Sequence, residues 1–206
     1  MAKSLFDLSG KVVLITGGNS GIGLGFAEGV ARQGADVCIW GRSIEKNAAV
    51  VERLGEFGTR VHAICCDVSD EQAVERSFAE TLEVFGRVDG CFANSGVARS
   101  ACFEDFSTED WRHVMDVNLD GLFYTLRCAA RHMKQRAEAG DPGGRLVGTS
   151  SLGALMGMAR VEAYAASKGA GISMMQALAV EYARWGITAH SILPGHIETA
   201  MTAENY

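Results

Sequence analysis

Six short runs of apolar residues alternate with longer amphipathic segments, and this alternation constrains the fold more than any other feature. The apolar runs cover residues 12–15, 37–40, 61–65, 88–92, 145–149 and 188–193, and the amphipathic segments cover 20–33, 43–57, 70–85, 108–139 and 161–185. Strands that alternate with helices form parallel sheets joined by crossovers. The runs are continuously apolar, as expected for strands covered on both faces. The pattern predicts one α/β domain over residues 1–206, a doubly wound parallel sheet with helices on both faces.

The longest amphipathic segment, 108–139, has an expected break or bend near residues 117–120, and the Asp-Pro-Gly-Gly sequence at 141–144 predicts a turn. Ligands of such sheets bind beyond the carboxyl ends of the strands. Functional residues are therefore expected directly after the apolar runs.

Composition narrows the classes of partner. The formal charge of −6 argues against nucleic acid or an anionic membrane as the main partner. No apolar stretch is long enough to span a bilayer, and the first ten residues lack the apolar core of a signal peptide. The six cysteines show no CxxC spacing typical of metal sites, and most lie in the apolar runs. We expect a reduced, cytoplasmic protein that acts on a small molecule and holds no metal.

The first apolar run ends in a glycine-rich segment at 16–23, Thr-Gly-Gly-Asn-Ser-Gly-Ile-Gly. Glycine permits positive φ and lets a backbone approach a ligand closely. The helix that follows presents free N–H groups and its positive dipole end to this loop, which suits a pyrophosphate. The spacing G-x-x-x-G-x-G differs from the G-x-G-x-x-G fingerprint. A phosphate loop and a plain strand-to-helix turn both remain open, and the position after the first strand favours the phosphate loop.

The end of the second run helps to choose between dinucleotides. An acid about 20 residues after such a loop binds a ribose 2′-hydroxyl, whereas an arginine accepts a 2′-phosphate. The run ends Trp40-Gly41-Arg42, and Asp36 lies at its other end. Arg42 therefore favours NADP(H), the alternative being a surface arginine at the start of a helix. After the third run, Asp67-Val68 would accept the adenine amino group, or Asp67 would cap a helix.

Tyr164 and Lys168 are four residues apart in a segment expected to be helical, so both side chains can reach one point. A free tyrosine has a pKa of about 10, and a nearby cation favours the phenolate. The pair is a candidate proton donor and acceptor. Taken alone, the same spacing is also common on solvated helix faces.

In their order, these motifs resemble those of the short-chain dehydrogenase/reductase family, and the resemblance covers nearly the whole chain. It rests on Thr16-Gly17-x-x-x-Gly21-x-Gly23, Asp67-Val68, Asn94-Ser95-Gly96, Asn118, Ser151, Tyr164-x-x-x-Lys168 and Pro194-Gly195-x-x-x-Thr199. Each motif is short, but their order and placement relative to the strands make the combination specific. The resemblance implies a Rossmann-fold, NAD(P)-dependent oxidoreductase that transfers hydride between a nicotinamide and a secondary alcohol or ketone.

The resemblance also implies a role for each catalytic residue. Tyr164 would give or take the hydroxyl proton, and Lys168 would favour the phenolate and bind the nicotinamide ribose. Ser151 would hold the substrate oxygen; it precedes Tyr164 by the family's spacing, which selects it over Ser150. Asn118 would hold a water that links Lys168 to solvent.

The expected cofactor is NADP(H) rather than NAD(H), and its binding residues come from every motif. They are Gly17, Asn19, Ser20, Gly21, Ile22, Gly23, Arg42, Asp67, Val68, Asn94, Gly96, Tyr164, Lys168, Pro194, Gly195, Ile197 and Thr199. The candidate substrate-lining side chains are mostly apolar and favour a medium-sized apolar alcohol or ketone, the alternative being ordinary core or loop packing: Val97, Leu152, Met156, Met158, His196 and Met201. The family implies a homodimer or homotetramer.

The chain departs from the family pattern at three places. Ser95 stands where alanine is usual. His190 stands where asparagine is common, and we expect it to pack at the end of its strand. The sequence stops at Tyr206, where family members continue through a substrate loop, a helix and a seventh strand. We expect the sixth strand to be an exposed edge and a C-terminal part to be omitted or truncated.

Two alternatives stay open at this point. A catalytically silent scaffold or regulatory protein would bind NAD(P) without turnover, although the intact Ser151, Tyr164 and Lys168 favour catalysis. A protein of the same fold could instead catalyse epimerisation or dehydration of a nucleotide-activated substrate, but such relatives usually run longer.

Overall fold

The computed structural model describes residues 5–199 and residue 202. In this part of the chain, the strands form one parallel sheet in the order β3-β2-β1-β4-β5-β6. The strands are β1 (Val12–Thr16), β2 (Asp36–Gly41), β3 (Val61–Cys65), β4 (Gly90–Ala93), β5 (Gly144–Thr149) and β6 (Ile187–Ile192). Since all of them run in one direction, their carboxyl ends share one edge of the sheet. The strand order reverses between β1 and β4, where ligands of such sheets bind.

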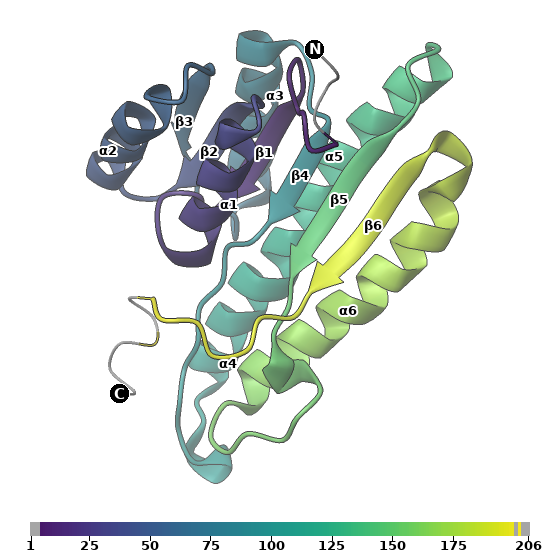
Figure 1. The fold of residues 1–206 in the computed structure, drawn as a ribbon. Coiled ribbons are helices and arrows are strands. Elements are labelled where there is room, and N and C mark those ends of the chain that lie inside the picture. Colours follow the sequence, from purple (N-terminus) through teal and green to yellow (C-terminus); the bar gives the residue numbers. More distant parts are fainter. Residues whose placement is uncertain (1–4, 200–201, 203–206) are drawn as a thin grey trace.

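Helices cover both faces, which confirms the predicted doubly wound α/β fold. They are α1 (Gly21–Arg32), α2 (Ile44–Gly55), α3 (Glu71–Phe85), α4 (Thr108–Met115), α5 (Gly121–Glu138) and α6 (Glu162–Tyr182). Helices α1 and α2 lie over the β1–β3 half of one face, and α3, α5 and α6 lie on the other (Figure 1). No helix of the described residues is long and apolar enough to cross a membrane.

Two apolar cores lie on the two sides of the sheet because successive strand side chains point to opposite faces. Leu14 and Trp40 join the larger core under α3, α5 and α6, whereas Ile15 and Ile39 join the smaller core under α1 and α2. All four side chains are fully buried. This two-sided burial explains why the strands are continuously apolar in sequence.

The expected break in the 108–139 segment is one turn of π-helix, η2 (Asp116–Asp120), between α4 and α5. A π-turn inserts an extra residue into a helix without ending it, and such turns often occur at functional sites. Asn118 lies at the centre of this turn and is 2% exposed.

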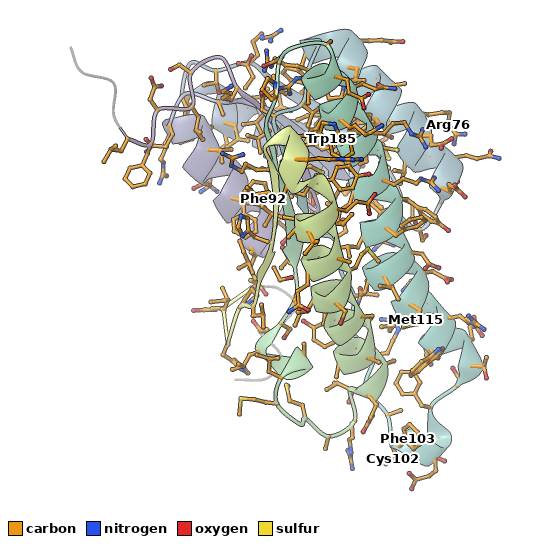
Figure 2. All side chains as sticks on the ribbon, turned by 90° about the vertical axis from the view of Figure 1, so that its right-hand side faces the viewer. Arg76, Phe92, Cys102, Phe103, Met115 and Trp185 are labelled. Carbon is orange, nitrogen blue, oxygen red and sulfur yellow. The ribbon has the colours of Figure 1, made fainter. Side chains whose placement is uncertain are left out.

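The structure contradicts the expected packing of His190, which is exposed. As expected, β6 is the outermost of the described strands on its side of the sheet. Its helix α6 covers one face, where Ala189 is buried, and His190 projects from the opposite face. Figure 2 looks toward this edge, with α6 in front and Phe92 on the side away from α5. His190, Phe92 and Val147 line an open depression of about 430 Å³ on that face.

Candidate active site

A cleft of about 220 Å³ opens at the carboxyl edge of the sheet. Its walls come from the loops after β1, β4, β5 and β6 and from α6, which are far apart in sequence. The lining residues are Gly17, Ser20, Gly21, Ile22, Asn94, Ser95, Gly96, Thr149, Ser150, Ser151, Tyr164, Lys168, Pro194, Gly195, Ile197, Thr199 and Thr202. The fold thus brings together most of the predicted catalytic and cofactor-binding residues.

A second cavity of about 160 Å³ continues the cleft toward β2 and β3. It is lined by Gly17, Asn19, Ser20, Gly41, Arg42, Cys66, Asp67, Val68, Ser95, Gly96, Val97 and Val117. Four residues line both cavities: Gly17, Ser20, Ser95 and Gly96. The two cavities therefore form one groove, with Tyr164 at one end and Arg42 at the other.

Lys168 is held in place at the Tyr164 end of this groove. Helix α6 contains both residues one turn apart, and the Lys168 Nζ lies 5.7 Å from the centroid of the Tyr164 ring. The same Nζ donates a hydrogen bond to the Thr149 carbonyl at 2.7 Å. Lys168 is only 5% exposed, and this burial lowers the pKa of its ammonium group to about 8.

The two adjacent serines after β5 have different surroundings. Ser151 lies in the cleft at the start of η3 (Leu152–Ala154), and its Oγ accepts a hydrogen bond from the Gly153 N–H at 3.1 Å. Ser150 is 5% exposed, and its Oγ donates to the Lys168 carbonyl at 2.9 Å. Ser150 thereby attaches α6 to the end of β5, while the Ser151 hydroxyl hydrogen remains available to a ligand.

Asn118 lies behind the cleft rather than in its wall. Its Oδ1 accepts from the Val97 N–H at 2.8 Å, and its Nδ2 donates to the Val97 carbonyl at 2.9 Å and to the Ser167 Oγ at 3.1 Å. The Ser167 Oγ in turn donates to the Tyr164 carbonyl at 2.7 Å. Asn118 therefore connects the loop after β4 to the first turn of α6.

A small cavity of about 10 Å³ lies between Asn118, Lys168 and Thr149. This volume is close to the smallest that holds one water. The buried Thr149 Oγ1 has no hydrogen-bond partner among the described residues. A water here would have polar partners on several sides.

The glycine loop is shaped by close contacts with β1 and β4. Gly17 and Gly21 have positive φ values of 64° and 51°, which favour glycine. A Cβ at Gly23 would overlap the Gly17 carbonyl, so Gly23 lies beneath the loop and supports it rather than lining the groove. The Thr16 Oγ1 accepts from the Asn94 N–H at 2.9 Å and thereby joins the loop to the end of β4.

The N-terminus of α1 faces the groove without a side-chain cap. Ser20 occupies the capping position but makes no capping hydrogen bond, whereas Ser43 and Asp70 cap α2 and α3. Free N–H groups at a helix N-terminus bind phosphate. Together with the glycine-lined loop, this arrangement fits the pyrophosphate of a dinucleotide.

Arg42 and Asp67 form a loose pair at the other end of the groove. The Arg42 Nη1 lies 3.9 Å from the Asp67 Oδ2, and the two side chains are 63% and 45% exposed. Burial acts to raise the pKa of Asp67, but hydrogen bonds from Ser69 and the Arg42 charge outweigh it and hold that pKa below its usual value. Asp67 does not cap α3, since Asp70 does so.

The side chains predicted to line a substrate pocket are not gathered into the cleft. Leu152, Met156 and Met158 follow Ser151 in the loop before α6 and are 42%, 58% and 50% exposed. Val97 lines the cavity at the Arg42 end. His196 is exposed, and Met201 lies outside the described residues.

Three residues that support the groove were missed by reasoning from sequence: Thr149, Ser167 and Asn47, whose Oδ1 accepts from the Asn19 Nδ2 at 2.7 Å. Thr149 holds Lys168 through its backbone carbonyl, which every residue type possesses, so the sequence carries no signal for it. Ser167 and Asn47 are polar residues inside predicted helices, and only their burial distinguishes them from surface residues. Among the described residues, no group of three or more histidine, cysteine or acidic side chains is arranged to hold a metal ion.

Comparison with known proteins agrees with this geometry. The short chain dehydrogenase family model matches residues 11–206. The 3beta-hydroxysteroid dehydrogenase of Mediterraneibacter gnavus is 37% identical over 193 residues, which cover 93% of this chain and 68% of the relative.

Two solved structures extend the comparison to the fold. A short chain dehydrogenase from Burkholderia cenocepacia in complex with NADP has a TM-score of 0.88 and 36% identity, covering 95% of this chain and 78% of its own. NAD+-bound xylitol dehydrogenase has a TM-score of 0.87 and 30% identity, and the match covers 93% of this chain and 72% of the xylitol dehydrogenase chain. The chain therefore belongs to the short-chain dehydrogenase/reductase family and is a nicotinamide-dependent oxidoreductase with a Rossmann fold.

Proposed function

We propose that this enzyme transfers hydride between NADP(H) and a secondary alcohol or ketone, with Tyr164 as the general acid and base. The observation that carries the proposal is the convergence of Ser151, Tyr164 and Lys168 on one cleft that continues into the glycine-lined groove. The nicotinamide, when bound, supplies or accepts the hydride.

The protein's own residues handle the proton and the oxygen. In reduction, the Tyr164 hydroxyl gives its proton to the substrate carbonyl oxygen, and in oxidation the phenolate takes a proton from the alcohol. The Ser151 hydroxyl donates a hydrogen bond to the same oxygen, which gains negative charge in the transition state. The Lys168 cation beside the Tyr164 ring stabilises the phenolate.

Reprotonation of Tyr164 from solvent needs a path, and the small cavity beside Lys168 supports one. It is large enough for about one water and is lined by Asn118, Lys168 and Thr149. We propose that Asn118 contributes to this relay by lining the small cavity, which lies behind the cleft. Its side chain also holds the Val97 loop against α6.

Arg42 supports the choice of NADP(H). A guanidinium group binds phosphate in a forked geometry, and Arg42 is sufficiently exposed to reach a 2′-phosphate at this end of the groove. The related structures contain either NADP or NAD+, so the choice for this chain depends on its own residues.

The loop between β5 and α6 supports an apolar substrate. Leu152, Leu155, Met156 and Met158 expose large apolar side chains directly after Ser151. We propose a medium-sized apolar alcohol or ketone. We also propose a cytoplasmic homodimer or homotetramer that pairs through α5 and α6, where Phe123 and Val180 are 41% and 83% exposed.

The decisive experiment replaces Tyr164 with phenylalanine. Turnover of a ketone panel, followed by NADPH absorbance, should fall by about three orders of magnitude, while NADPH binding persists. Tyr124→Phe, on α5 outside the groove, is the matched control and should retain full activity. Undiminished turnover in Tyr164→Phe would exclude this acid/base role. NADPH binding by the wild type without turnover of any carbonyl would favour the silent alternative.

A further inference from the structure

Asn47 is buried beneath the Arg42 end of the groove and uses its whole amide group. It lies in α2 and is 5% exposed. Its Nδ2 donates to the Gly41 carbonyl at 2.9 Å and to the Ile64 carbonyl at 3.3 Å. Since carbonyls only accept, the NH₂ group of Asn47 must face them, and its Oδ1 then accepts from the Asn19 Nδ2 at 2.7 Å. One side chain thus ties the ends of β2 and β3 to the glycine loop.

The paired amides of Asn19 and Asn47, here called the amide bridge, fill the space beside Gly41. A Cβ at Gly41 would lie 2.6 Å from the Asn19 Cγ and 2.7 Å from the Asn47 Oδ1. Both distances are far below van der Waals contact. While the amide bridge is in place, position 41 cannot carry a side chain.

We propose that Asn47 is a positioning residue for cofactor choice: the amide bridge keeps position 41 free of a side chain and leaves Arg42 to recognise the ribose. This inference rests on the proposed use of NADP(H). An acid at the end of the second strand would bind a 2′-hydroxyl. The amide bridge occupies the space that such an acid would need at position 41, and it fixes Asn19 in the wall of the cavity that Arg42 lines.

The first test compares wild type, Asn19→Ala, Asn47→Ala and the double variant by titration with NADPH and NADH. Loss of the bridge should weaken the binding of NADPH more than that of NADH, because only NADPH carries the 2′-phosphate proposed to bind at Arg42, next to Asn19 in the same cavity wall. We expect the ratio of the NADH to the NADPH dissociation constant to fall about five- to tenfold in each single variant, the effect of one lost hydrogen bond. The double variant should show the same ratio of dissociation constants as the single variants, because each of the three variants removes the hydrogen bond between Asn19 and Asn47.

A matched control separates cofactor choice from general stability. Thr81→Val removes another buried hydrogen bond to β2, the one from the Trp40 Nε1 at 3.2 Å on the opposite face. This variant should lower the melting temperature and leave the cofactor ratio unchanged. If Asn47→Ala does not fold, Asn19→Ala carries the test, because it leaves both carbonyl contacts of Asn47 in place. An unchanged ratio in the variants overturns the inference.

The second test places an acid at position 41. The Gly41→Asp variant alone should have a lower melting temperature and should bind both NADPH and NADH more weakly than the wild type. Added to Asn19→Ala/Asn47→Ala, the carboxylate has room, and NADH should bind about tenfold more tightly than to the parent double variant. Tight NADH binding by Gly41→Asp alone would overturn the inference. If the wild type binds NADH more tightly than NADPH, the proposed NADP(H) dependence is wrong, and this inference falls with it. If the wild type prefers NADPH but the variants keep the wild-type ratio of dissociation constants, only the inference is wrong.

Discussion

The groove carries a cation at each end, and the two cations lie in opposite surroundings. Arg42 is 63% exposed in its side chain and faces Asp67 across 3.9 Å. Lys168 is 5% exposed and donates to the Thr149 carbonyl at 2.7 Å. Burial lowers the pKa of Lys168 to about 8, so its charge is costly and responsive to pH, whereas a guanidinium keeps its charge at any physiological pH. The buried cation suits proton chemistry, and the exposed one suits recognition of an anionic ligand.

The largest expected effect follows from removing the buried cation. Lys168→Met should reduce turnover about a thousandfold, because the Tyr164 phenolate loses the charge that stabilises it. Steady-state kinetics with NADPH and a reactive ketone would measure this loss. Lys134→Met, a partly exposed lysine on α5 that pairs with Glu138, should leave turnover unchanged. Equal activity of the two variants would contradict the role of Lys168.

The next effect is the contribution of Lys168 to the pH dependence of stability. In the folded state its pKa is about 8, below the ordinary lysine value of 10.5, so the unfolded chain binds more protons between these values. The contribution of Lys168 to the free energy of unfolding should therefore rise with pH across this window, by about 3 kcal/mol, while the buried cysteines, whose pKa values are raised, contribute with the opposite sign above pH 9. Denaturant unfolding without cofactor, at pH 7 to 10.5, would measure it. The free energy of unfolding of the wild type minus that of Lys168→Met should rise by the same amount over this pH range. A difference that stays constant with pH would contradict the lowered pKa of Lys168.

A smaller effect should follow from reversing the exposed cation. Arg42→Asp should weaken NADPH and strengthen NADH, shifting the ratio of their dissociation constants about 10- to 100-fold, because the 2′-phosphate meets a carboxylate. Arg76→Asp is a well-matched control, since Arg76 is 68% exposed and lies 3.9 Å from Asp70. That change should not affect the ratio. If the wild type binds NADP(H) no better than NAD(H), the assignment of Arg42 is wrong.

The smallest effect concerns the support of the buried cation. Ser150→Ala leaves the buried Lys168 carbonyl without the Ser150 hydrogen bond and should destabilise the fold by about 1 kcal/mol. Turnover should fall only a few-fold, because Thr149 still holds the ammonium group. Thermal unfolding would measure the loss of stability, and steady-state kinetics on the same preparation would measure the loss of turnover. A loss as large as that of Lys168→Met would mean that Ser150, rather than Ser151, acts on substrate.

The fold could be predicted from sequence because each strand is continuously apolar and each helix amphipathic. The predicted ends of some strands and helices differ by a few residues from the observed ends, because an apolar run can extend beyond the residues that form backbone hydrogen bonds. Val88 was placed in the fourth strand because it is apolar, but the ladder with β1 and β5 begins at Gly90. The predicted helix at 161–185 tightens into the 3₁₀ turn η4 (Ala183–Trp185) after Tyr182.

The residues that line the groove could be predicted where their side chains have recognisable chemistry, and the supporting residues could not be predicted where a backbone carbonyl or a buried amide makes the contact. The groove gathers Tyr164, Ser151 and Arg42, which have recognisable side-chain chemistry. The Thr149 carbonyl carries no sequence signal. Asn47 was missed for a related reason, since it resembles any polar residue of an amphipathic helix until its three partners are known.

The single π-turn at Asp116–Asp120 sets the phase between two helices. In an α-helix each residue advances the face by about 100°, so an extra residue accommodated as regular helix would rotate everything after it by that angle, and the π-turn absorbs this rotation. Helix α4 contacts α6, while α5 contacts chiefly α3, β4 and β5 and less extensively α6, so the two helices pack mainly through different faces. Forcing the same residues into regular α-helix would turn the apolar side of α5, with Leu126 and Met133, away from the sheet, whereas deleting one residue of the turn would restore a regular helix that keeps this side on the sheet. The turn that positions Asn118 therefore also keeps the apolar side of α5 in phase with the sheet.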